Sequence, residues 1–157
     1  MSAQVHLSKH FTLDELAHTS SGLTNRPTQL VIKHLTKVCE NVLEPVREQF
    51  KRPLVISSGY RSLAVNRAVR SADTSQHIKG EAADFHVQGH SVYEVAAWIN
   101  DNLDFDQLIL ENFVPSQLYS GWVHCSYGPR MRNQILTKFR GSSNYYPGLN
   151  VTPSRKS

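Results

Sequence analysis

Apolar residues recur every three or four positions between Thr28 and Phe50, which is the spacing of one buried helical face. The residues of this face are Val31, Leu35, Val38, Val42, Val46 and Phe50. Pro45 lies within the segment and lacks the backbone N–H group that a continuous helix needs. The pattern therefore predicts a helix over 28–50 that Pro45 bends or divides.

Start signals indicate shorter helices. Thr12 is followed by Glu15, and Ser91 by Glu94, at the spacing of a capping box, in which a hydroxyl and an acid satisfy the first backbone N–H groups. The residues after Ser62 favour one more short helix. These helices are predicted over about 12–18, 62–69 and 92–102.

Other segments show short apolar runs or an alternation of apolar and polar positions, which is typical of strands. In the segment EAADFHV, Ala83, Phe85 and Val87 share one face, whereas Asp84 and His86 share the other. The predicted strands cover 54–56, 81–87, 107–111, 121–127 and 134–139. Because helices precede strands rather than alternating with them, we expect an α+β fold with a mainly antiparallel sheet.

The length and composition indicate one globular domain. The chain has 157 residues, of which 39% are hydrophobic and 19% charged, as is ordinary for a soluble protein with a real core. We expect the domain to cover 1–141, and residues 142–157, rich in Ser, Asn, Pro and Gly, to form an irregular or disordered tail.

Targeting signals are not evident in the sequence. No apolar run approaches the ~20 residues that cross a bilayer, and the first residues lack the pattern of a secretory signal. Cys39 and Cys125 do not suggest a disulfide framework, which fits a reducing compartment. We therefore expect synthesis in the cytoplasm and no membrane span.

The formal net charge is +4, which favours anionic partners such as nucleic acid or the acidic polymers of a bacterial envelope. A nucleic-acid-binding stripe would require clustered Lys and Arg residues, whereas those of this chain are scattered along it. We therefore expect no nucleic-acid partner.

Two of the eight histidines stand out as candidate metal ligands. His77 opens the run HIKGEAADFHV, in which Gly80 and two alanines remove bulk just before Asp84 enters a strand. His124 lies in the strand-like segment GWVHCSY. Two histidines and one carboxylate are a set that zinc accepts while keeping a fourth position open. A buried histidine bonded to Asp84 without any metal is the alternative that the spacing leaves open.

Four motifs, in this order along the chain, are SGYRS, SQHIKGEAADFHV, FDQLILE and GWVHCSY. Together they resemble the zinc D-alanyl-D-alanine peptidase family, peptidase family M15, and especially its branch of small phage and bacterial single-domain members. The likeness extends over about residues 7–139. It implies a fold similar to that of the hedgehog amino-terminal domain, in which a small antiparallel sheet flanked by helices carries the metal.

The resemblance also implies roles for individual residues. His77, Asp84 and His124 would hold one Zn²⁺ ion. Arg61 would pair with a substrate carboxylate, for which its planar fork is suited, although a surface salt bridge is the alternative. Ser75 would contact the substrate or a neighbouring ligand, or would merely cap the loop.

The general base is expected at Glu111. Several family members place an acid three residues before the last histidine, where this chain has Gly121. Glu111, at the end of FDQLILE, resembles the acid of the corresponding strand in the phage branch, and Asp106 is the second candidate. We expect Glu111 to take the proton of the attacking water and to deliver it to the leaving amine.

Two neighbours of these residues need a separate interpretation. His86 shares the Asp84 face and is expected either to orient a ligand or to border the site. Cys125 adjoins His124, but strand alternation turns it to the other face, so we expect it in the core.

The resemblance implies a function in cell-wall degradation. The expected reaction is hydrolysis of an amide bond in the stem or cross-link of bacterial peptidoglycan, by a monomeric, endolysin-like endopeptidase. Such a protein would reach the wall after holin-type release, after lysis, or on a phage particle. A D-Ala-D-Ala carboxypeptidase and a non-catalytic zinc-binding interaction domain remain as alternatives.

Overall fold

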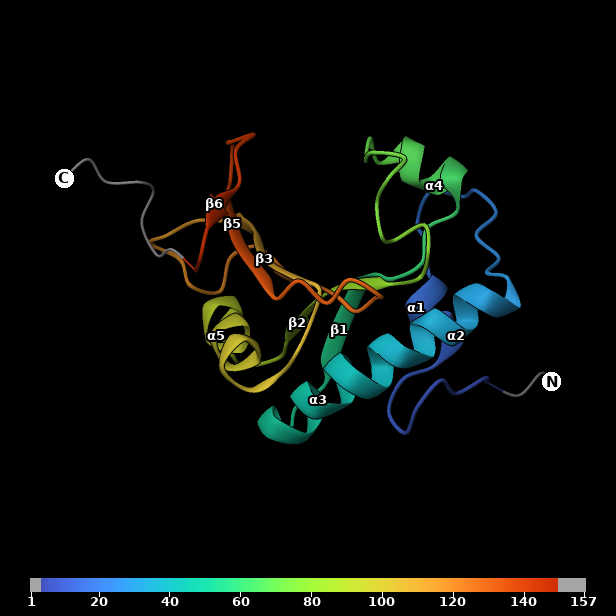
Figure 1. Cartoon of the computed structure of the whole chain (residues 1–157), viewed down its shortest axis with the longest axis horizontal. Coiled ribbons are helices and arrows are strands. Elements are labelled where there is room, and N and C mark those ends of the chain that lie inside the picture. The colour runs from blue at the N-terminus through green and yellow to red at the C-terminus, as the bar shows by residue number, and fades with distance from the viewer. Residues whose placement is uncertain (1–3, 150–157) are drawn as a thin grey trace.

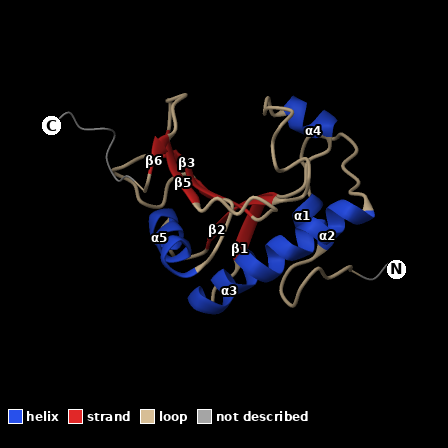
Figure 2. Ribbon diagram, in the orientation of Figure 1, coloured by secondary structure: helices blue, strands red, loops and turns tan. Residues whose placement is uncertain are grey.

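A six-stranded sheet with helices packed against one face organises residues 4–149, which are the residues that this computed structural model describes. Figure 2 shows the helices α2, α3 and α5 together beneath the strands. Figure 1 shows α4 with its following loop rising on one side above the sheet, and β5 with β6 rising on the other. Within residues 4–149, no helix is both long and apolar enough to cross a membrane.

The helices begin where the capping residues predict. Thr12 forms a complete capping box with Glu15, and the hydroxyls of Ser62 and Ser91 each accept a backbone N–H bond in the first turn of the following helix. The helices are α1 (Leu13–Ala17), α2 (Gln29–Val38), α3 (Glu44–Phe50), α4 (Leu63–Ala68) and α5 (Val92–Asn102). These starts confirm the predicted helices.

The long helical segment is divided as expected, by a wide π-helical turn, η1 (Cys39–Leu43), between α2 and α3. Pro45 follows this turn and lies in the first turn of α3. The chain stays helical through Leu43 and Glu44, so the missing N–H group of Pro45 removes one helical hydrogen bond, and the interruption of the α-helix just before it is the expected response to that loss.

The strands lie in the order β1-β2-β4-β3-β5-β6. They are β1 (Leu54–Ser58), β2 (Ala82–Val87), β3 (Gln107–Phe113), β4 (Trp122–Ser126), β5 (Gln134–Phe139) and β6 (Tyr146–Pro147). All neighbouring strands are antiparallel except β3 and β5, which are parallel. The α+β class with a mainly antiparallel sheet is confirmed, and the parallel pair adds to it.

The segment after Gly141 is more ordered than we predicted from its composition. Tyr146–Pro147 pairs with β5, and the N–H of Gly148 donates to the carbonyl of Ile135 at 2.8 Å. The prediction of an irregular segment is therefore wrong for these residues. The proline in this segment does not exclude a strand, because proline is tolerated on an edge strand, where no further strand needs its N–H group. Residues 150–157 of the expected tail lie outside the described residues.

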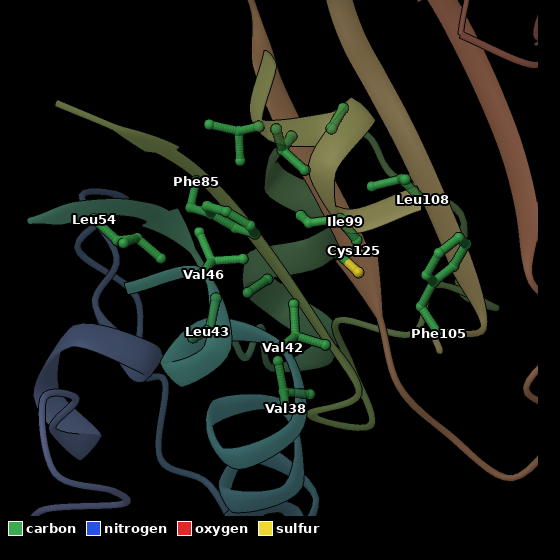
Figure 3. Packing of buried hydrophobic residues seen from close by; sticks show 14 of the residues in the cluster. Val38, Val42, Leu43, Val46, Leu54, Phe85, Ile99, Phe105, Leu108 and Cys125 are labelled. Atoms are coloured by element: carbon green, nitrogen blue, oxygen red, sulfur yellow. The ribbon is translucent and has the colours of Figure 1, made fainter. Parts of the chain in front are cut away.

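The sheet has one apolar face and one polar face. Phe85, Leu108 and Cys125 point toward the helices and pack with side chains of the η1 turn, α3 and α5 (Figure 3). Phe85, Leu108 and Cys125 are completely buried. Because side chains alternate along a strand, the neighbours of these residues face the opposite side. That second face is free of helices α2, α3 and α5 and carries the candidate site.

Candidate metal centre and catalytic cleft

Three side chains from separate parts of the chain converge on the polar face of the sheet. His77 comes from the loop between α4 and β2, Asp84 from β2 and His124 from β4, directly opposite Asp84. One ligand atom from each lies within 4.8 Å of the other two. Oδ1 of Asp84 is 3.3 Å from Nε2 of His77 and 2.9 Å from Nδ1 of His124. The structure thus brings together the three residues that the sequence singled out.

The tautomer of His77 is fixed by its surroundings. Its Nδ1 lies 2.6 Å from the carbonyl oxygen of Gly59, and because a carbonyl can only accept, Nδ1 carries the proton. Nε2 then presents a lone pair toward Asp84. This nitrogen is buried and has no hydrogen-bond partner within residues 4–149. A buried polar atom without a partner is costly, and a metal cation in front of Nε2 would satisfy it.

Asp84 is held in its ionised form. Burial acts to raise its pKa, but the neighbouring His77 and His124 outweigh burial and lower the pKa below the ordinary value. The second carboxylate oxygen, Oδ2, receives Nη2 of Arg61 at 3.4 Å. Two imidazole nitrogens and one carboxylate oxygen fit the ligand preference of a zinc ion, and the orphaned Nε2 supports that fit.

Gly80 explains how the loop reaches this point. Its φ is +74°, and a Cβ atom there would lie 2.8 Å from Val31 of helix α2. Only glycine allows the loop to pass so close to the helix in this conformation. The sequence indicated a close approach here, and the structure shows that the approach is made to α2.

A cleft of about 850 Å³ surrounds the three residues on the polar face. The loop after α4 lines one side of it, and β5 with the residue before β6 lines the other. Its lining includes Arg61, Ser75, Glu111, Trp122, Lys138 and Tyr145.

Glu111 stands next to the three candidate metal ligands on this face. It is paired with Trp122, whereas Ile109, two residues earlier, is paired with His124. Diagonal neighbours of this kind are roughly 7–8 Å apart, within reach of a glutamate side chain. Burial raises the pKa of Glu111, and His124, Asp84, Lys138 and Arg61 act on it more weakly and in both directions. A carboxylate with a raised pKa is a stronger base, as proton abstraction from water requires.

The similarity of the sequence to a known family agrees with this geometry. A family model described as Peptidase M15 matches residues 9–126, a range that contains His77, Asp84, Glu111 and His124. The chain belongs to the M15 peptidase family. It is therefore a peptidase, a hydrolase of amide bonds. No curated protein matches the sequence. Strands β5 and β6 lie beyond the range matched to the M15 family.

This M15 peptidase has a physical reason for glycine at position 121. Gly121 has a φ of +71°, and a Cβ atom there would lie 2.0 Å from the carbonyl oxygen of Glu111. No side chain fits between the two strands at this point, so an acid three residues before His124 is excluded. The acid on the cleft face is instead Glu111 on the neighbouring strand.

The second candidate for the general base, Asp106, has a different environment. Its side chain is 0% exposed, Nε of Arg132 lies 2.6 Å from Oδ1, and Nε2 of Gln76 lies 2.8 Å from Oδ2. Burial acts to raise its pKa, but these contacts lower it overall. Asp106 is thus an anchor beneath the cleft wall, and the geometry favours Glu111 as the base.

Arg61 does not form the surface salt bridge that was the alternative. Its Nε donates to Ser58 at 2.9 Å and its Nη1 to Asn66 at 3.0 Å, in addition to the contact with Asp84. The side chain is only 14% exposed. In this structure, Arg61 orients the carboxylate of Asp84, and two of its five N–H groups remain for another acceptor.

Ser75 caps the loop that carries His77. Its hydroxyl accepts the backbone N–H of His77 at 3.2 Å, which is the structural alternative considered from the sequence. Ser75 also lines the cleft, so a contact with substrate stays a prediction.

Strand alternation determines on which face of the sheet the two remaining candidates, Cys125 and His86, lie. Cys125 is completely buried in the core, as predicted, and burial raises the pKa of its thiol. His86 pairs with Val55 of β1 and is not among the cleft-lining residues. Within the described residues, the structure therefore gives no contact by which His86 would orient a ligand.

Sequence reasoning missed Lys138, Tyr145 and Gln76. Lys138 alternates with buried Thr137, which was a usable signal once β5 was predicted. Tyr145 lay in the segment that we expected to be irregular, and Gln76 lay in a polar loop without a pattern.

Proposed function

We propose that this M15 peptidase is zinc-dependent and hydrolyses an amide bond in the stem peptide or cross-link of bacterial peptidoglycan, as an endopeptidase acting at the cell wall. The observation that carries the proposal is the convergence of two imidazoles and one carboxylate, with the lone pair of His77 buried and unsatisfied, beside Glu111. The donor set supports zinc. The family supports the peptide substrate.

His77, Asp84 and His124 would hold the ion. When bound, zinc would supply Lewis-acid polarisation of the scissile carbonyl and would lower the pKa of water. Arg61 keeps Asp84 oriented toward the two histidines. The Gly59 carbonyl keeps the proton of His77 on Nδ1, away from the ion.

Glu111 would carry the proton through the reaction. Its carboxylate takes one proton from the attacking water as the oxygen bonds to the scissile carbon, and it delivers that proton to the amine nitrogen as the C–N bond breaks. The products are a carboxylate and a free amine. The presence of this acid beside the metal ligands favours an enzyme over a non-catalytic zinc-binding domain.

The shape of the cleft favours an endopeptidase over a D-Ala-D-Ala carboxypeptidase. The cleft continues from Arg61 past the ligands to Tyr145, so it offers room for substrate on both sides of the cut. A carboxypeptidase needs a cation committed to the terminal carboxylate. Arg61 is largely committed to protein acceptors instead.

Digestion of purified peptidoglycan, followed by mass spectrometry of the released ends, tests the proposal. We expect new amine ends within the stem or cross-link, loss of activity with a chelator and recovery with zinc. Release of terminal D-Ala alone would establish the carboxypeptidase instead. No cleavage at all by the zinc-loaded protein would remove the peptidoglycan substrate from the proposal.

The variant Glu111→Gln tests the proton carrier. It should retain bound zinc but lose roughly 10²–10⁴-fold in turnover, the range typical of general acid–base catalysis. Glu48→Gln, an exposed change on α3, makes the same chemical substitution outside the cleft and should leave turnover unchanged. Near-normal turnover in Glu111→Gln would contradict the assigned role.

A further inference from the structure

Four cleft side chains lie side by side across the sheet. Glu111 of β3 pairs with Trp122 of β4. On the other side of β3, Leu110 pairs with Thr137 and Phe113 with Phe139, so Lys138 alone faces the two residues Glu111 and Asn112. Asn112 has a φ of +52°, as expected of a bulge. Bulges of this kind redirect side chains next to active sites, and here the bulge lies between the proposed base and Lys138.

Tyr145 completes the row. Thr137 pairs with Tyr146 in the antiparallel β5–β6 ladder, which places Tyr145 beside Lys138 on the cleft face. Burial raises the pKa of the Tyr145 phenol, and the negative charges of Glu111 and Asp84 add to that rise. The phenol is therefore neutral and keeps its O–H donor. The row thus ends in two adjacent hydrogen-bond donors, an ammonium and a phenol.

Of the cations that line the cleft, Lys138 and Arg70 form no ion pair within residues 4–149. Arg70 is exposed, whereas Lys138 is half-buried, and the charge of Glu111 acts on it from beyond ion-pair distance. Arg61 pairs with Asp84, and Arg130 and Arg132 both contact Asp106. For Lys138, no carboxylate within residues 4–149 lies within ion-pair distance and no hydrogen bond is formed, although the residue is half-buried. A partly desolvated ammonium without a partner is unfavourable and is relieved by an incoming anion.

We propose that Lys138, together with the hydroxyl of Tyr145, determines substrate specificity by binding a free carboxylate on the substrate residue next to the scissile amide. This inference rests on the proposed peptidase action on peptidoglycan stem peptides, and it assigns the anion-binding role to Lys138 rather than to Arg61. An ammonium and a phenol can both donate to one carboxylate, which gives a charge-assisted contact. The substrate class is therefore a peptide with an acidic group, rather than its amide, beside the bond that is cut.

The test compares two synthetic stem peptides that differ only in whether this carboxylate is free or amidated, next to the bond identified by the peptidoglycan digestion. We expect the wild type to cleave the free acid about 10- to 100-fold more efficiently in kcat/KM, the size typical of one charge-assisted hydrogen bond. Lys138→Gln should lower kcat/KM far more for the acid than for the amide, so that the two peptides are cleaved about equally well. Lys138→Arg should keep most of the preference, and Tyr145→Phe should lose part of it.

Lys33→Gln provides the matched control, since it removes the same charge from the exposed face of α2, away from the cleft. If Lys138→Gln lowered kcat/KM equally for both peptides, the proposal would be overturned, because equal losses would show that Lys138 acts only through its effect on Glu111. Equal cleavage of both peptides by the wild type would overturn it as well. Thermal melting and zinc content of Lys138→Gln should match the wild type, which excludes a folding defect.

A binding measurement separates this inference from the proposed function. Titration calorimetry with the Glu111→Gln variant, with and without Lys138→Gln, gives the affinity for each peptide without turnover. A preference for the acid that disappears with Lys138→Gln supports the anion site even where cleavage fails. Equal affinities in an enzyme that does cleave peptidoglycan would overturn the anion site and leave the proposed function intact.

Discussion

The position of the imidazole proton determines which nitrogen of His77 can bind a metal. The Gly59 carbonyl holds it on Nδ1, so Nε2 is available as a ligand before any metal arrives. A site prepared in this way needs no rearrangement of the ring on binding. The same carbonyl lies just before Tyr60 and Arg61, so one turn of chain prepares the tautomer of His77 and, through Arg61, the orientation of Asp84.

Gly121 gives a prediction at the residue scale. Gly121→Ala would place a methyl group 2.0 Å from the Glu111 carbonyl at a φ of +71°. Gly141, with a φ of +82° and open space around it, provides the matched control. Backbone strain alone should cost Gly141→Ala about 1 kcal/mol. Strain and overlap together should cost Gly121→Ala roughly 2–4 kcal/mol. Urea unfolding measures both, and equal losses would contradict the close approach.

At the scale of elements, the loop between α4 and β2 carries the proposed metal ligand His77 without regular structure of its own. The hydrogen bonds that hold it in place include the Ser75 cap on the His77 backbone, His77 to the Gly59 carbonyl, the Arg61 N–H to the His77 carbonyl, and Gln76 to Asp106, which precedes β3. The buried Asp106 is in turn held by Arg132. The position of the ligand therefore depends on a carboxylate that does not touch the metal site.

Asp106→Asn tests this anchoring. Loss of a charge-assisted contact should destabilise the protein by roughly 1–3 kcal/mol in urea unfolding and should weaken zinc binding by loosening the loop. Asp104→Asn, an exposed neighbour, should change neither quantity. Unaltered zinc affinity in Asp106→Asn would show that the other contacts of the loop suffice.

The pH dependence of the same variant has a definite sign. Although burial acts to raise the pKa of Asp106, Arg132 and Gln76 lower it overall, so its stabilising contribution is complete above the unfolded pKa of about 3.9. That contribution is lost as the pH falls through the lower, folded pKa. The stability difference between wild type and Asp106→Asn should therefore be constant at neutral pH and shrink in strong acid. A difference that grows below pH ~4 would contradict the lowered pKa.

For the molecule as a whole, a metal would join a loop, β2 and β4, which belong to distant parts of the chain. An ion that binds only the folded state stabilises it by mass action. At free zinc 100-fold above Kd the gain is about 2.7 kcal/mol, or roughly 5–10 °C in Tm. Scanning calorimetry should show that Tm falls by this amount when a chelator is added and recovers when zinc is restored. His124→Ala should be insensitive to chelator, and a chelator-insensitive wild type would argue against the metal.

The parts of this fold that could be predicted from the sequence have local causes. Capping residues such as Thr12 and Ser91 act within one turn, and the alternation around Asp84 shows which side of β2 is buried. The parallel pairing of β3 with β5 joins segments that are separated by β4, so no local pattern predicted it. The strand β6 is only two residues long and lies in a segment whose composition is typical of loops, so it was missed as well. The place of Lys138 in the cleft follows from that pairing and was missed with it.

The choice between two acids illustrates the same limit for the site. Asp106 lies just before β3 and Glu111 within it, and both looked available in the sequence. Only their surroundings, a buried arginine contact for one and an open cleft for the other, distinguish them. The motif resemblance pointed to His77, Asp84 and His124 as candidate metal ligands, whereas burial distinguished the two acids.

The two-sided sheet also has an evolutionary consequence. Gln107, Trp122 and Lys138 face the cleft, while their immediate neighbours Leu108, Val123 and Thr137 are buried. Substitutions at these three cleft positions can thus change which peptides are accepted, while the buried neighbours maintain the fold. Selectivity and fold integrity are separable traits in this architecture, so new specificities can arise without passing through unstable ancestors.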